Sequence, residues 1–220
     1  MHCRAHAYEL FTCELPHLET TQGLWRAAIA VSMHELDDVD PVALDDAPAA
    51  IARQVRDRVR SDHPEALLAH LHEVMFDELG FTGNTEDYYD AANSYVPLVL
   101  ERRLGLPITL TLVYKCVAER VGLRVHGVNA PWHFIAEVEL DEGAMLVDPF
   151  CGGRTLKPAE AFEQMQRAGG LPVPRDKRLL KRATHRQWLA RILQNLMNVF
   201  HGTQREEDLA AMVELQQLLS

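Results

Sequence analysis

Residues 101–153 read ERRLGLPITLTLVYKCVAERVGLRVHGVNAPWHFIAEVELDEGAMLVDPFCGG, and this stretch decides the fold. Apolar residues run nearly all round the segment 107–121, which begins with Pro107 and is followed by Gly122. This pattern predicts a helix buried in the middle of a domain, and proline suits its first position. Strand patterns follow at 124–129, 132–140 and 145–148, with a hairpin turn at 141–143. The stretch therefore predicts a central helix followed by a small sheet.

His133 lies in the middle strand and Asp148 ends the next one. The hairpin makes these strands neighbours, so Asp148 is well placed to accept the ring N–H of His133. We predict this hydrogen bond, and two interpretations of it remain open. A carboxylate orients the catalytic histidine of many hydrolases, but a histidine on a half-buried strand is also commonly a satisfied core residue.

A thiol nucleophile would belong at the start of the central helix, because a helix N-terminus stabilises a thiolate. That position holds Pro107. Thr109 lies two residues further on, about 200° round the helix, and so faces away from it. Cys116 is expected to pack in the core. Cys151 follows the Asp-Pro-Phe turn and is either a reactive thiol near Asp148 or an ordinary loop cysteine.

Helices are predicted on both sides of this stretch. The first twenty residues are weakly patterned and are expected to be loosely ordered. Segment 81–95 has loop composition. An acidic stretch at 35–46 is expected to be a solvated loop leading into a helix. A basic run at 175–186 is expected to be a solvated linker whose charges pair with those of the acidic stretch. The helices expected outside the central one are 21–34, 47–61, 64–79, 95–104, 158–168, 184–201 and 204–219.

Composition excludes several classes of function. The net charge of −10 over 220 residues argues against a nucleic-acid partner. No apolar run is long enough to predict a membrane span, and the N-terminus does not resemble a signal peptide. The four cysteines form no CxxC pair, which favours reduced thiols and a cytoplasmic location.

No cofactor is expected. The sequence contains neither a P-loop nor a GxGxxG motif, so no nucleotide site is indicated. His70 and His72 are two residues apart on a predicted helix and point to different faces. His126 and His133 could approach each other across paired strands, but no clear third ligand accompanies them, so no metal is expected.

Four blocks of sequence together resemble a known family. They are EVMFDELGFTGNTEDYYDAANSYV at 73–96, VLERRLGLPITLTLVY at 99–114, VGLRVHGVNAPWHFIAEVE at 121–139 and LVDPFCGG at 146–153. They resemble the SirB-type transglutaminase-like family, the second transglutaminase-core family. The resemblance implies an α+β fold with a papain/transglutaminase-like core, in which a central helix packs on a small antiparallel sheet.

The resemblance also implies helical parts at both ends. The expected organisation is an N-terminal helical segment at 1–60, the transglutaminase-like core at 61–170, and a C-terminal helical hairpin at 171–220. This hairpin is similar to a truncated tetratricopeptide unit. All three are expected to form one compact unit.

The resemblance places the triad positions at Pro107, His133 and Asp148. By this resemblance, His133 and Asp148 occupy the positions of the catalytic histidine and aspartate of active transglutaminase-like enzymes. Pro107 occupies the position of their catalytic cysteine. Proline at this position is similar to what the SirB-type family as a whole shows. The residue after Phe150 is usually Asn in such sequences and is Cys151 here. The family's name comes from a regulatory link in bacteria, and a related domain occurs in a eukaryotic F-box protein. Neither identifies a reaction.

Two functions remain as hypotheses. The first is a non-catalytic, regulatory module, a pseudoenzyme that binds a protein or peptide partner in the cleft. The second is an amide hydrolase or acyl transferase with an unorthodox site around His133 and Asp148. The cleft is expected between the central helix and the His133 strand, lined by Tyr95, Arg102, Thr109, Trp132 and Cys151.

Overall fold

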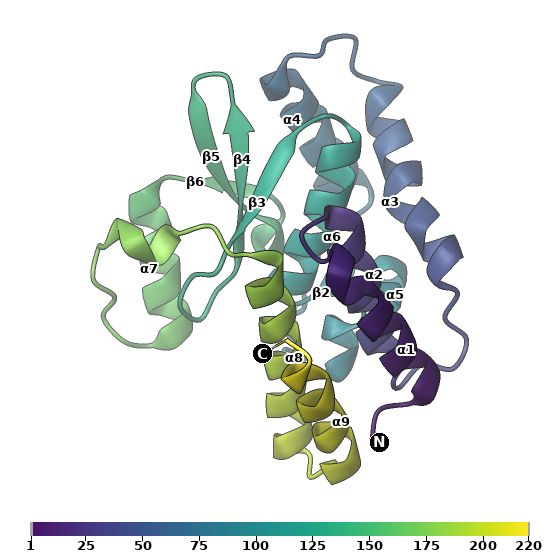
Figure 1. The fold of residues 1–220 in the computed structure, drawn as a ribbon. Coiled ribbons are helices and arrows are strands. Elements are labelled where there is room, and N and C mark those ends of the chain that lie inside the picture. Colours follow the sequence, from purple (N-terminus) through teal and green to yellow (C-terminus); the bar gives the residue numbers. More distant parts are fainter. Residues whose placement is uncertain (1, 220) are drawn as a thin grey trace.

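The computed structural model describes residues 2–219 and has the predicted α+β fold (Figure 1). Its α-helices are α1 (Ala5–Glu14), α2 (Thr21–Ser32), α3 (Pro41–Arg56), α4 (Pro64–His72), α5 (Val96–Arg102), α6 (Pro107–Arg120), α7 (Pro158–Gly169), α8 (His185–Gly202) and α9 (Glu206–Gln217). Its strands are β1 (Thr82–Gly83), β2 (Leu104–Gly105), β3 (Arg124–Val128), β4 (Ile135–Leu140), β5 (Gly143–Asp148) and β6 (Arg154–Leu156).

The main sheet is antiparallel, with strand order β3-β4-β5-β6. In its register, His126 pairs with Glu137 and Leu146 pairs with Leu156. Strand β6 was not predicted, because three residues are too few to show an alternating pattern. A separate, short parallel pair joins β1 to β2, with Thr82 opposite Leu104.

The sheet lies between α7 on one side and the helical body containing α6 on the other (Figure 1). Alternate residues of the strands enter two different buried clusters, as the period of two requires. The cluster shared with α6 takes Val125, Phe134, Ala136, Val138 and Val147. The cluster shared with α7 takes Val128, Ile135, Leu146 and Leu156. Along the middle strand, Phe134, Ala136 and Val138 therefore face α6, and Ile135 faces α7.

Helix α6 is the central helix that the sequence predicted. Every residue from Pro107 to Ala118 is buried. It packs against the sheet, the N-terminal helices and α8. The indole Nε1 of Trp188 in α8 donates a hydrogen bond to the carbonyl oxygen of Ile108, at 3.2 Å. This bond fixes α8 beside the first turn of α6.

The expectation of a loosely ordered N-terminus is wrong. Residues Ala5–Glu14 form α1, which packs on α2 through the buried side chains of Ala7 and Phe11. The backbone N–H groups of His2 and Cys3 each donate to the carboxylate of Glu214 in α9, at 2.8 Å. Helix α1 buries only a few apolar side chains, so the sequence shows little helical periodicity there.

Three predicted boundaries also differ. Helix α3 begins at Pro41 and not at 47, because the Asp40 side chain accepts hydrogen bonds from the N–H groups of Val42 and Ala43. After α4 the chain continues as a π-helix, Glu73–Glu78. The middle strand begins at Ile135, so Trp132 and His133 lie in the turn before it.

The predicted pairing of the basic run with the acidic stretch at 35–46 is wrong. Arg182 bonds to Glu137 and Glu139 on β4, at 2.6 and 3.0 Å. Arg175 pairs with Glu163, at 3.5 Å. The run therefore lies against the sheet, where Val128 and Arg182 form a β-bridge. In the acidic stretch, Asp45 pairs with Arg26 and Glu35 pairs with Arg205.

Helices α8 and α9 pack side by side at the C-terminal end of the chain (Figure 1). Their relation to tetratricopeptide units stays a prediction, as do the segment boundaries at 60 and 170. A single buried cluster contains residues from Cys3 to Leu219. Within residues 2–219, no helix has the length and apolar character needed to cross a membrane.

Candidate functional site

A cavity of about 1110 Å³ opens between α7, α8 and the turn that precedes β4. Its wall includes all three triad positions, Pro107, His133 and Asp148. Helix α6 brings Pro107 to the cavity, the turn before β4 brings His133, and the end of β5 brings Asp148. The structure thus brings together the three residues that the sequence singled out.

His133 and Asp148 form the hydrogen bond that the sequence predicted. The Nε2 atom of His133 lies 2.8 Å from Oδ2 of Asp148. The backbone N–H of His133 donates to the carbonyl oxygen of Ala130, at 3.2 Å, which holds the turn. The remaining ring nitrogen of His133, Nδ1, has no hydrogen-bond partner among residues 2–219.

Asp148 is completely buried and its carboxylate is well satisfied. Its Oδ1 atom accepts hydrogen bonds from the backbone N–H groups of Phe150, at 3.0 Å, and Cys151, at 3.3 Å. Burial alone would raise the pKa of Asp148, but the hydrogen bonds from His133 and from Cys151 bring the pKa below its ordinary value. Asp148 is therefore ionised at neutral pH and orients the His133 ring.

No thiolate is available beside this pair. Cys151 lines the cavity, but burial and the nearby Asp148 carboxylate raise the pKa of its thiol to about 11. Cys116 packs in the core as predicted, and burial raises its pKa to about 12. At neutral pH both thiols are almost entirely protonated, and a protonated thiol is a poor nucleophile.

Trp132 stands out on the cavity wall. Its side chain is 48% exposed, although it is a large aromatic residue. Its backbone has a φ of 56°, in the left-handed region, which bulky residues rarely adopt. The indole lies against Gly169 so closely that a Cβ added there would be 2.4 Å from the ring. Glycine at 169 is therefore what lets the Trp132 ring lie on the end of α7.

Tyr88 and Tyr89 form another part of the wall, and their rings meet edge to face at 5.4 Å. Two buried asparagines fix the loop that carries them. Asn84 Nδ2 donates to Asn93 Oδ1, at 3.0 Å, and Asn93 Nδ2 donates to the Asp87 carbonyl oxygen, at 2.7 Å. The loop is therefore positioned by hydrogen bonds on its inner side while its tyrosines face the cavity.

Only part of the predicted cleft lines this cavity. Trp132 and Cys151 do, whereas Tyr95, Arg102 and Thr109 do not. Tyr95 is buried and donates to Glu35, at 2.6 Å, beside a smaller cavity. Arg102 pairs with Asp90, at 2.9 Å. Thr109 is completely buried in α6. These three placements were wrong because sequence order alone does not show which side of α5 and α6 faces the His133 turn.

The sequence interpretation missed a wall of carboxamides. Seven lining side chains are amides, and four of them come from α8: Asn129, Gln164, Gln187, Gln194, Asn195, Asn198 and Gln216. The solvent face of an amphipathic helix usually carries charges, whereas this face of α8 carries amides and Arg191. That departure was visible in the sequence and could have indicated a binding surface.

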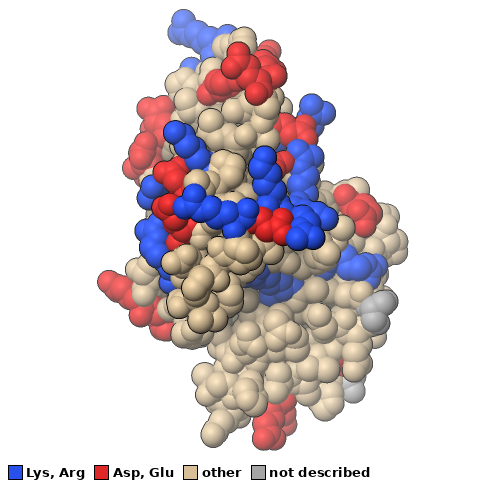
Figure 2. Space-filling model, turned by 90° about the vertical axis from the view of Figure 1, so that its left-hand side faces the viewer, with Lys and Arg blue, Asp and Glu red and all other residues tan. Residues whose placement is uncertain are grey.

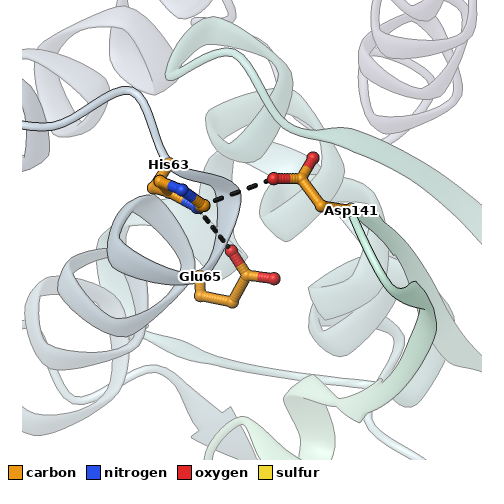
Figure 3. A group of neighbouring side chains, drawn as sticks. All are labelled: His63, Glu65 and Asp141. Atoms are coloured by element: carbon orange, nitrogen blue, oxygen red, sulfur yellow. Dashed lines mark hydrogen bonds and ion pairs between the residues drawn. The ribbon is translucent and has the colours of Figure 1, made fainter.

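The metal-binding interpretation gains little from the structure. His63, Glu65 and Asp141 form an exposed group that joins the start of α4 to the β4–β5 turn (Figure 3). The His63 ring lies 3.1 Å from Glu65 and 3.6 Å from Asp141. The hydrogen bond to Glu65 and the charge of Asp141 raise the pKa of His63. Ion pairing of the exposed His63 ring with two carboxylates accounts for this group without a metal ion.

Residues 45–194, most of the chain, match the Transglutaminase-like superfamily. The chain belongs to this superfamily. A UPF0162 protein of Xylella fastidiosa is 36% identical over 191 residues, which cover 85% of this chain and 68% of the relative. A UPF0162 protein of Pseudomonas aeruginosa is 28% identical over 202 residues, covering 90% and 71%.

F-box only protein 21 of Mus musculus is 38% identical over 102 residues, covering 43% of this chain and 16% of the relative. No solved structure gives a significant match. In this transglutaminase-like chain, His133 and Asp148 form a hydrogen bond at the cavity wall, and Pro107 begins α6 beside the same cavity.

Proposed function

We propose that the chain is a non-catalytic transglutaminase-like protein that binds a peptide segment of a partner protein in the cavity beside His133. The observation that carries this proposal is the cavity wall. Amides and aromatic rings dominate it, and Pro107, whose side chain cannot act as a nucleophile, lies among them. The SirB-type designation and a regulatory role in the bacterial cytoplasm remain part of the same proposal.

The amides suit the backbone of a peptide, because each carboxamide offers both a donor and an acceptor. The Oε1 atoms of Gln164 and Gln216 are buried and have no hydrogen-bond partner among residues 2–219. A buried acceptor left without a partner costs about 1–3 kcal/mol. Both side chains line the cavity, so a rotation that turns these oxygen atoms into it would let peptide N–H groups satisfy them.

The aromatic side chains suit the side chains of such a peptide. Trp132, Tyr88 and Tyr89 are all exposed at the cavity. Large aromatic residues dominate recognition energies at protein interfaces. The volume of about 1110 Å³ exceeds that of most small-molecule pockets and leaves room for several residues.

An array of capped 12-residue peptides of randomised sequence, probed with the purified chain, tests this proposal. The wild type is expected to retain a subset of peptides, and Trp132→Ala is expected to lose them. Val42→Ala is the matched control, since Val42 is exposed and lies outside the cavity. Equal retention by the Trp132 variant would place the binding surface elsewhere.

The alternative function, an amide hydrolase or acyl transferase, rests on the intact pair of His133 and Asp148 at 2.8 Å. Because position 107 carries no thiol, such a mechanism would need a water molecule or another nucleophile beside the free Nδ1 atom. Hydrolysis of peptide amides by wild-type protein, persisting after all four cysteines are replaced, would favour this alternative. Absence of turnover is what the binding proposal expects.

A further inference from the structure

The two arginines of the cavity wall, Arg167 and Arg191, have no carboxylate partner among residues 2–219. The chain has 32 acidic residues against 22 basic ones, so carboxylates are abundant. Other arginines near the cavity elements do pair, such as Arg154 with Glu160 and Arg175 with Glu163. Both guanidinium groups at the cavity therefore lack a carboxylate, although arginines on neighbouring segments have one.

Arg191 is half-buried in α8, and its orientation is fixed. Its Nη1 atom donates to the carbonyl oxygen of Ala130, at 2.8 Å, and to the side-chain oxygen of Asn129. Its guanidinium carbon lies 5.9 Å from the centre of the Phe134 ring. No described residue accepts a hydrogen bond from its Nε and Nη2 atoms. These donors are positioned in advance, which lowers the entropy cost of binding a ligand.

The cavity wall carries more positive than negative side chains, whereas the whole chain has a net negative charge. Among the lining residues the one carboxylate is that of Asp148, which is completely buried and already accepts from His133 and two backbone N–H groups. Figure 2 shows the side of α7, where charged side chains crowd the upper and middle parts and the lower part is almost uncharged. A concave site with unpaired cations concentrates anions.

We propose that Arg191 binds a carboxylate group of the peptide that occupies the cavity, with Arg167 adding to the positive potential. This inference rests on the proposed peptide binding and specifies it. A guanidinium with two free donors matches the two oxygens of a carboxylate. Glutamate or aspartate side chains and the C-terminal carboxylate share this chemistry.

The Ala130 carbonyl oxygen accepts from both Arg191 and the His133 backbone N–H. Arg191 therefore also braces the turn that carries His133, and the experiment must separate these two roles. Arg191→Gln removes the charge but keeps an amide donor for the Ala130 oxygen. Arg186→Gln is the matched control, because Arg186 is exposed on the same helix and does not line the cavity.

The probes are peptides that the wild-type chain selects from the array. Each peptide is made with its Glu or Asp residues intact and with these residues replaced by Gln or Asn. Each is also made with a free and with an amidated C-terminus. The wild type is expected to bind the carboxylate forms about tenfold or more tightly than the amide forms, as charge-assisted hydrogen bonds allow. Arg191→Gln is expected to abolish this preference, and Arg186→Gln to keep it. The pair of forms that shows the preference identifies the source of the carboxylate.

Equal affinity of the wild type for carboxylate and amide forms would overturn the carboxylate site while leaving peptide binding intact. An equal loss of both forms in Arg191→Gln would show that Arg191 only braces the turn, and would also overturn it. If no peptide binds the wild-type chain, the proposed function itself fails, and the inference fails with it.

Discussion

Pro107 sits at the first position of α6 and lines the same cavity as His133 and Asp148. Pro107→Cys would place a thiol at a helix N-terminus, where the helix dipole lowers a thiol pKa. We expect iodoacetamide at neutral pH to alkylate this introduced thiol on the order of 100-fold faster than Cys151, whose pKa of about 11 leaves little thiolate. Mass spectrometry of tryptic peptides would measure both rates. Similar rates at the two positions would show that this helix start does not activate a thiol.

Asp148 is expected to stabilise the fold as well as orient His133. Asp148→Asn removes the charge from the buried acceptor of His133, Phe150 and Cys151, and we expect a loss of about 2 kcal/mol in the free energy of unfolding near neutral pH. The pKa of Asp148 is lower in the folded chain than in the unfolded one, where it is about 3.9. Its contribution is thus present above that value and is lost as the pH falls through the folded pKa.

The difference in unfolding free energy between wild type and Asp148→Asn should accordingly shrink below about pH 4. Urea unfolding at several pH values would measure it. Asp176→Asn is the matched control, because Asp176 caps a short helix in the same way but lies nearer to the surface. We expect a much smaller loss for Asp176→Asn than for Asp148→Asn, because exposed ion pairs contribute little to stability. A pH-independent difference for Asp148 would contradict the ionised pair.

At the scale of elements, the end of α7 and the turn before β4 depend on each other through Gly169 and Trp132. Gly169→Ala would put a methyl group 2.4 Å from the indole, so the ring must move. We expect a shift in the tryptophan emission spectrum and a loss of peptide binding, with the fold retained. Gly202→Ala in α8 meets no atom within 4 Å and serves as the control. Unchanged emission in the Gly169 variant would show that α7 adjusts instead.

Long elements with clear periodicity were predictable, and the turns between them were not. The apolar run of α6 and the alternation around Ala136 determined the central helix and the sheet. His133 was expected inside a strand, but the positive φ of Trp132 forms a turn that a strand pattern does not reveal. The hydrogen bond of His133 with Asp148 was still predictable, because the hairpin that pairs β4 with β5 fixes their approach.

The residues that line the rest of the cavity were harder to predict than the pair of His133 and Asp148. Arg191 and the α8 amides lie more than fifty residues from His133 in the sequence. Only the packing of Trp188 against the first turn of α6 brings them to the cavity. Tyr95 and Arg102 were predicted to line the cleft, yet both bond to acidic residues outside the cavity.

At the scale of the whole molecule, the two ends of the chain are tied together. Glu214 in α9 accepts from the backbone of His2 and Cys3, and one buried cluster contains side chains of both α1 and α9. We expect urea unfolding to be a single cooperative transition, with coincident curves from far-UV circular dichroism and tryptophan emission. An earlier transition in one signal would mean that the chain does not unfold as one cooperative unit.

Pro107 has one more consequence, which concerns the backbone. The first N–H groups of a helix have no partner within the helix, and acyl-transfer enzymes use such groups to stabilise the oxyanion that forms on the attacked carbonyl. Proline has no amide hydrogen, so position 107 lacks this donor as well as the sulfur atom. A nucleophile supplied from elsewhere on the wall, such as Cys151, would still face a carbonyl that this helix start cannot polarise through residue 107. Only a substitution at position 107 itself would supply both the backbone N–H donor and the sulfur atom.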